Sequence, residues 1–250
     1  MTIPAPARPF LLIAHGSRDP RHAATVAALV EQVRVLRPGL ETATAYLDHC
    51  APRIPQVAGR LPDAVAVPLL LNRAFHAKHD IPAALRSAGA DLPVADVLGP
   101  SPLLLAALER RLAESGLDTS SPLVRARTGV VLAAAGSSDP AADAATRALA
   151  AGWHEAGGWA GVEVAYASAG GPRVPEAVAA LRSAGAQRVA VAPYLLAPGL
   201  LPDRIAAAAG DADVLAPVLG ASPELAGLLL RRYDEACRAA LAAPALSATA

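Results

Sequence analysis

Two histidines in the first half of the chain, His15 and His76, each come shortly after an apolar run that is typical of a buried strand. The runs are Phe10–Ala14 and Ala64–Leu70. The carboxyl ends of parallel strands lie at one edge of a sheet, where open α/β sheets place their ligands. Neutral imidazole can bind a divalent metal ion or accept a proton near neutral pH. We therefore expect His15 and His76 to share a site for a borderline divalent metal such as Fe, Co, Ni or Zn.

Further polar residues lie close to these histidines in the sequence. Asp48 follows the next apolar run and can supply a carboxylate, although a polar residue after a strand is also ordinary loop. His79 could share a helical face with His76, but this spacing alone is a weak metal motif. His49 and Cys50 are weaker ligand candidates. Asp80 is expected to cap the helix that follows it.

The elements that must position these residues alternate between strands and helices. Such alternation, with nearly continuous apolar strands, favours a parallel sheet covered by helices on both faces. Pro20 stands where the first helix would begin, because its fixed φ suits a first turn. In the first half we expect strands at 10–14, 42–47, 64–70 and 93–98, and helices over 23–36, after Pro52, over 81–87 and over 102–115.

The second half of the chain repeats the first. Four blocks recur in the same order at offsets of 120 to 125 residues, which indicates duplication. The predicted fold is therefore α/β, with two similar parallel-sheet, Rossmann-like halves. We expect a first half over 1–116, a polar linker over 117–127, a second half over 128–241 and a tail over 242–250. The matching blocks are 11–20 with 131–140, 45–55 with 165–175, 64–71 with 189–196, and 98–102 with 219–223.

The repeat separates structural residues from candidates for chemistry. The residues Gly16, Ser17, Asp19 and Pro20 recur in the second half, as expected for a tight turn followed by a helix cap. His15 is replaced there by Ala135, so the turn does not need a histidine. The second-half loop over 197–205 likewise contains no histidine, and Ser168 stands in place of Asp48. The alternative for His15 is a buried histidine bonded to neighbouring backbone.

Composition and motifs exclude several classes of function. The 22 basic and 22 acidic residues cancel, so no excess of cations is available to neutralise nucleic acid. The two cysteines, Cys50 and Cys237, match no paired spacing and favour a reduced, cytoplasmic chain. No apolar run is long enough to predict a membrane span, and the first residues do not resemble a signal peptide. The sequence has no phosphate-cradling GxxxxGK[ST], no GxGxxG after a strand and no GxSxG nucleophile elbow.

Two motifs resemble the CbiX/SirB group of sirohydrochlorin chelatases, within the class II chelatases. One is the apolar strand followed by His-Gly-Ser-Arg-Asp-Pro at 15–20, and the other is His-x-x-x-Asp-Ile-Pro at 76–82 after a Val-Pro-Leu strand. The duplicated layout is similar to the long, two-repeat form. The resemblance implies two halves related by a pseudo-two-fold axis with a cleft between them, the second half being a degenerate copy. A conserved acidic residue of the group, usually Glu, falls on Asp48, and the usual glycine-rich loop reads Asn72–Phe75 here.

The resemblance also implies an activity. We expect an ATP-independent lyase that inserts Fe²⁺ into sirohydrochlorin to give sirohaem. His15 and His76 would bind the metal and accept the two pyrrole protons, and Asp48 would assist. Sirohydrochlorin is a polycarboxylate, and the expected binding residues are Ser17, Arg18, Arg73 and Lys78.

The expected partners are sirohydrochlorin and a divalent metal ion, Fe²⁺ or Co²⁺, as substrates. We expect no permanently bound cofactor, no nucleic acid, no membrane, and a monomer or homodimer. One alternative is Co²⁺ insertion for cobalamin synthesis, because both ions accept the same ligands. Another is a metal or tetrapyrrole carrier without turnover. A phosphoryl-transfer enzyme with His15 as nucleophile is disfavoured, because His15 and Gly16 lack an adjacent arginine-rich signature.

Overall fold

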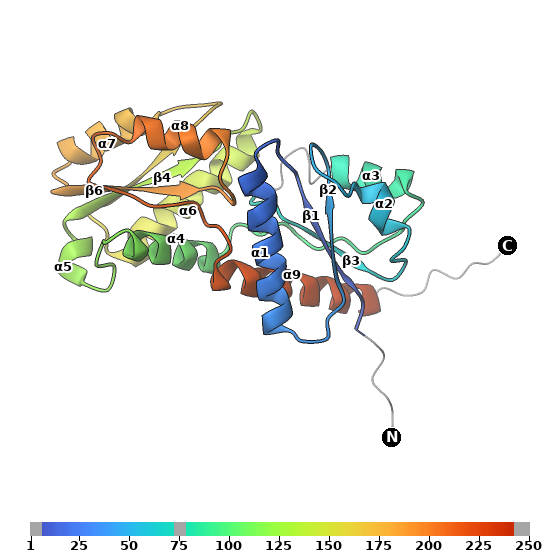
Figure 1. Ribbon diagram of the computed structural model, residues 1–250. Helices are drawn as coiled ribbons and strands as arrows, with labels where there is room; N and C mark the ends of the chain where they lie inside the picture. The colour runs from blue at the N-terminus through green and yellow to red at the C-terminus, as the bar shows by residue number, and fades with distance from the viewer. Residues whose placement is uncertain (1–6, 73–78, 243–250) are drawn as a thin grey trace, which may run out of the picture.

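The computed structural model describes residues 7–72 and 79–242, and it shows an α/β protein with two parallel sheets (Figure 1). The first half contains β1 (Phe10–Ala14), α1 (Pro20–Leu36), β2 (Thr42–Tyr46), α2 (Ile54–Ala58), β3 (Val65–Pro68), α3 (Ile81–Ser87) and α4 (Pro102–Glu114). The second half contains α5 (Pro122–Arg125), β4 (Thr128–Ala134), α6 (Pro140–Gly157), β5 (Gly161–Tyr166), α7 (Val174–Ser183), β6 (Arg188–Tyr194), α8 (Leu200–Ala208), β7 (Val214–Leu215) and α9 (Pro223–Ala242).

Three strands of the second sheet repeat the order of the first, which confirms the duplicated α/β fold. The first sheet has the strand order β2-β1-β3 and the second β5-β4-β6-β7, with every neighbouring pair parallel. Strand β1 is central in the first sheet, and β4 takes the same place in the second. The residues after β1 therefore lie at the middle of the carboxyl edge, where a parallel sheet presents its ligands.

The fourth strand expected over 93–98 is wrong as a strand. Only Val94 pairs with the sheet, through a single parallel bridge to Ala66, and Val94 is 41% exposed. The amides of Ala66 and Ala95 make the bridging hydrogen bonds to Pro93 and Ala66. Proline has no N–H group to donate to a neighbouring strand, so a residue such as Pro93 is found at the edge of a sheet and does not extend the hydrogen-bonded ladder. The second half has a two-residue strand, β7, as its outermost strand.

Three apolar clusters hold the sheets between helices. One face of the first sheet packs under α2 and α3, and one face of the second packs under α7 and α8. The opposite faces of both sheets belong to one continuous core shared by the two halves. Alternation along the strands produces this division: Phe10 and Leu12 enter the shared core, whereas Leu11 and Ile13 face the first half's own helices.

The last helix of each repeat packs against the other repeat. Helix α9 packs on α1 and β3 of the first half, and α4 packs on β6 of the second (Figure 1). Arg37, after α1, makes two hydrogen bonds of 2.5 and 2.8 Å to the carboxylate of Asp234 in α9. Arg232 of α9 also donates to the carbonyl of Val97 at 2.9 Å. The shared core is thus closed by an exchange of helices between the halves.

The segment over 117–127, expected to be a linker, contains the short helix α5. Arg125 of α5 pairs with Glu109 of α4 at 2.7 Å and donates to the carbonyl of Gly157 at 2.9 Å. These contacts tie the segment to both α4 and α6. We keep 117–127 as the proposed junction between the two repeats.

Among the described residues no helix combines the length and apolar character that crossing a membrane requires.

The turns after the two central strands are built alike. Gly16 and Gly136 have φ values of 91° and 89°, in the left-handed region that favours glycine. A Cβ atom at Gly16 would lie 1.8 Å from the carbonyl oxygen of Asp48. Asp19 and Asp139 then cap α1 and α6 by accepting the amide hydrogens of Arg21 and Ala141. The residues common to both repeats therefore have the structural role that the sequence predicted.

Replacing Gly136 with alanine should destabilise the protein far more than the same change at Gly116. Both residues have φ near 90°, so both variants suffer the left-handed cost of about 1–2 kcal/mol. Only at Gly136 would the new Cβ also meet a backbone atom, the Ala169 carbonyl oxygen, at 2.1 Å. At Gly116 nothing described lies within 4 Å. Urea unfolding of the two variants measures the difference, and equal losses would contradict the clash.

Candidate functional site

His15 lies directly beyond the central strand β1, in a pocket at the carboxyl edge of the first sheet. The pocket has a volume of about 350 Å³ and is lined by His15, Leu47, Asp48, Asp80, Ala83 and Ala84. The backbone amide of Asp48 donates to the His15 carbonyl at 2.8 Å, which extends the pairing of β1 and β2 beyond the strands. The structure therefore brings together His15 and Asp48, two residues that the sequence singled out 33 positions apart.

Asp48 is held as a carboxylate by its neighbours. The His49 amide donates to it at 2.8 Å, and the guanidinium of Arg53 lies 2.9 Å from the same oxygen. The hydrogen bond from His49 and that from Arg53 lower the pKa of Asp48 below its ordinary value. Because the Asp48 side chain is half exposed, it is a charged group at the mouth of the pocket.

Two residues received too little weight from sequence alone: His49, beside His15 and Asp48, and Asp80, in the pocket wall. The ring of His49 lies edge-on to that of His15, with centroids 6.4 Å apart, and its Nε2 is 3.4 Å from Asp48. Asp80 lines the same pocket, and the expected capping bond is wrong, because its side chain makes no cap hydrogen bond to α3. Asp80 has helical backbone angles (φ −72°, ψ −45°), whereas a capping residue normally has extended ones.

The remaining predicted site residues divide into two groups. Ser17 and Arg18 follow His15 in the turn. The Ser17 hydroxyl accepts the Asp19 amide at 3.1 Å, and Arg18 is exposed, with no ion pair to any residue of 7–72 or 79–242. Cys50 contacts Ser17 through its thiol, at 3.1 Å from the Ser17 carbonyl.

The predicted residues His76, Arg73 and Lys78 lie outside the described residues. Within the described part of the chain, no three His, Cys, Asp or Glu side chains form a metal-binding cluster.

The corresponding place in the second half has lost these groups. Ala135 follows β4 where His15 follows β1, and its carbonyl accepts the Ser168 amide at 2.9 Å, as that of His15 accepts Asp48. The Ser168 hydroxyl also donates to Ala135, at 2.6 Å. The backbone of the two sites is thus equivalent, while the imidazole and the carboxylate are present in the first repeat alone. This comparison within one chain separates the fold from the chemistry.

Comparison with known proteins gives a consistent result. The CbiX family model matches the chain twice, over residues 9–115 and 129–236. A sirohydrochlorin cobaltochelatase of Priestia megaterium is 27% identical over 90% of this chain and 78% of its own length. A sirohydrochlorin ferrochelatase of the same organism is 28% identical, over 78% of this chain and 75% of its own.

Solved structures share the fold. SirB from Bacillus subtilis with Fe³⁺ superposes with a TM-score of 0.76 at 23% identity, covering 93% of this chain and 96% of that one. A CbiX described as the terminal enzyme for biosynthesis of siroheme in denitrifying bacteria has a TM-score of 0.66 at 22% identity, covering 94% and 100%. The two matches to the family model correspond to the two repeats and together span most of the chain, which therefore belongs to the CbiX family.

Proposed function

We propose that this protein is a sirohydrochlorin chelatase that inserts Fe²⁺ into sirohydrochlorin to give sirohaem. One observation carries the proposal: an imidazole, that of His15, is present at the carboxyl edge of one repeat only, in a pocket with Asp48. The curated relatives are named as sirohydrochlorin chelatases, and the family membership supports the same substrate class. Metal insertion without ATP agrees with a sequence that has no phosphate-cradling loop.

The proposed mechanism uses groups suited to both metal binding and proton transfer. Two pyrrole N–H protons must leave the macrocycle as the metal enters. A neutral imidazole can bind the metal or accept a proton, since its ordinary pKa is about 6.5. We assign these roles to His15 and His76. Asp48, whose lowered pKa keeps it ionised, adds negative charge beside His15 and His49. Ser17, Arg18, Arg73 and Lys78 are proposed to bind the carboxylates of the substrate.

A direct assay tests the function. Purified protein is mixed anaerobically with sirohydrochlorin and Fe²⁺, Co²⁺ or Ni²⁺, and insertion is followed by the change in the absorption spectrum. Fastest insertion with Fe²⁺ supports the proposal. Preference for Co²⁺ would favour cobalt insertion, the alternative that the cobaltochelatase relative supports. Binding of sirohydrochlorin without insertion of any metal would identify a carrier.

Replacing Asp48 with asparagine should slow metal insertion by about 10- to 100-fold, the usual cost of removing a carboxylate that supports a metal-site histidine. The variant keeps the shape of the side chain but removes the charge beside His15 and His49. Asp63→Asn is the matched control, because exposed Asp63 lines a different hollow, which contains no histidine. Initial rates at saturating sirohydrochlorin and Fe²⁺ measure the effect, and equal rates for both variants would exclude a role for Asp48.

A further inference from the structure

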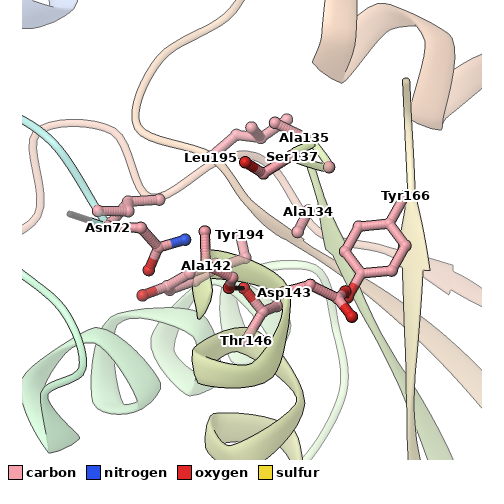
Figure 2. Close-up of a pocket in the computed structure, with 12 residues that line it drawn as sticks. Asn72, Ala134, Ala135, Ser137, Ala142, Asp143, Thr146, Tyr166, Tyr194 and Leu195 are labelled. Carbon is pink, nitrogen blue, oxygen red and sulfur yellow. Dashed lines mark hydrogen bonds between the residues drawn. The ribbon is translucent and has the colours of Figure 1, made fainter. Parts of the chain in front are cut away.

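A second cavity, of about 100 Å³, lies where the two halves meet (Figure 2). Most of its wall comes from the second half: the carboxyl ends of β4, β5 and β6 and the first turns of α6. The first half contributes Leu71 and Asn72, which follow β3. The cavity is distinct from the His15 pocket, and the described residues His15, Asp48, Ser17 and Arg18 do not line it.

Three side chains at this cavity have hydrogen-bond donors that the protein leaves available. Tyr194 is 2% exposed, yet its hydroxyl makes no hydrogen bond within residues 7–72 and 79–242. Burial raises the pKa of Tyr194, so the hydroxyl keeps its proton at neutral pH. The amide of Asn72 is likewise unpaired in the described part of the chain. Ser137 accepts the Asp139 amide at 3.0 Å, which leaves its own hydroxyl proton to donate.

The carboxylate that lines the cavity, that of Asp143, already accepts two hydrogen bonds. One carboxylate oxygen of Asp143 accepts the hydroxyl of Tyr166, and the other accepts Nε of Arg147 at 2.9 Å. Arg147 therefore neutralises the one acidic group on this wall. The Thr146 hydroxyl donates to the Ala142 carbonyl at 3.0 Å. The amino-terminal end of α6, an 18-residue helix with a positive dipole end, adjoins the same space. A buried tyrosine hydroxyl without an acceptor, beside these groups, favours an anion.

The repeat shows that two of the polar side chains at this cavity, those of Tyr194 and Asp143, are specific to the second half. The register that aligns β3 with β6 places Leu69 opposite Tyr194, and Ala23 stands opposite Asp143. The fold therefore needs neither the tyrosine hydroxyl nor the carboxylate at these places. Residues present in one repeat only were the signal that marked His15, and the same test marks Tyr194 here.

We propose that Tyr194, Ser137 and Asn72 bind one carboxylate side chain of the tetrapyrrole substrate. This inference rests on the proposed function. Pockets that enclose a drug-sized ligand have volumes of about 300–1,000 Å³. A cavity of about 100 Å³ admits a side chain but not a macrocycle. Asn72 follows β3, which pairs with β1 and hydrogen-bonds beyond it through Leu69 and Ile13 at 2.8 Å. The cavity therefore adjoins the sheet edge that presents His15, so one polycarboxylate could contact both places.

The test is a titration with metal-free sirohydrochlorin, followed by its absorption and fluorescence. Tyr194→Phe should raise the dissociation constant about tenfold, the loss expected when a hydrogen bond to a charged group is removed. Tyr233→Phe is the matched control, since it removes another buried tyrosine hydroxyl, bonded to the Arg8 carbonyl, outside both cavities.

Asn72→Asp provides a second variant, in which the side chain keeps its shape but becomes negatively charged. A carboxylate in place of the amide should repel the substrate and raise the dissociation constant by tenfold or more, and it decides the matter if Tyr194→Phe does not fold. Parent-like binding by Tyr194→Phe and Asn72→Asp would overturn the inference and leave the chelatase proposal intact. Equal weakening by Tyr194→Phe and Tyr233→Phe would also overturn it, because the effect would then be general. Failure of the parent protein to bind sirohydrochlorin would overturn both proposals.

Discussion

Replacing His15 with alanine should lower the rate of metal insertion by about 10²- to 10⁴-fold, the usual contribution of a positioned general base. The imidazole follows β1 directly, and the second repeat lacks it at the end of β4, where Ala135 stands. Since Ala135 occupies an equivalent turn, alanine at position 15 should leave the fold intact. Insertion of Fe²⁺ into sirohydrochlorin, followed by absorption under anaerobic conditions, measures the loss.

His154→Ala is the control for this variant. His154 is exposed on α6, and its replacement removes an imidazole from the surface without touching either cavity. It should insert metal at the parent rate. His76→Ala should show a loss similar to that of His15→Ala, because the two histidines are proposed to share the metal and the protons. Parent rates for both His15→Ala and His76→Ala would exclude the mechanism.

The sequence predicted the parts of this fold that local patterns determine. Apolar runs gave three strands of the first sheet within two residues of their ends, and Pro20 after Asp19 marked the start of α1. The proximity of His15 and Asp48 followed from topology alone, because both residues come after adjacent parallel strands. The repeat added a comparison within one chain, and it distinguished Gly16, which the turn requires, from His15, which it does not.

Longer-range features could not be predicted in this way. The exchange of α4 and α9 depends on which sheet each helix reaches, and the apolar pattern of a helix does not report which sheet it will cover. Val94 makes one isolated bridge to the edge of the first sheet instead of forming a strand. Hydrophobic periodicity does not report how many residues of a segment will pair with a neighbouring strand. The cavity at Tyr194 is formed by residues from both repeats, so it exists only once the halves are packed together.

The helix exchange leads to the second large prediction: neither repeat should fold when it is produced alone. A fragment of residues 1–127 loses α9, which buries Leu225, Leu228, Leu229 and Tyr233 in the shared core. Burying such side chains contributes about 1.5–3 kcal/mol each, and together the four contribute roughly 6–12 kcal/mol. That amount is comparable to the whole stability of a typical domain, about 5–15 kcal/mol. The fragment should therefore show no cooperative unfolding transition in urea, followed by circular dichroism.

The fragment of residues 1–127 and the complementary fragment that begins at residue 128 should fold when they are produced together. A break within 117–127 leaves both sheets present, together with the helices α1, α4, α6 and α9 of the shared core. Helix α9 can still reach α1, and α4 can still reach β6. Ion pairs between the fragments, such as Arg110 with Glu224 at 2.6 Å and Arg37 with Asp234, remain available. Copurification with one cooperative transition would show that the exchanged helices, rather than the covalent connection, unite the halves. A stable 1–127 fragment would show that α9 is dispensable, and the duplication would then be two independent domains in sequence.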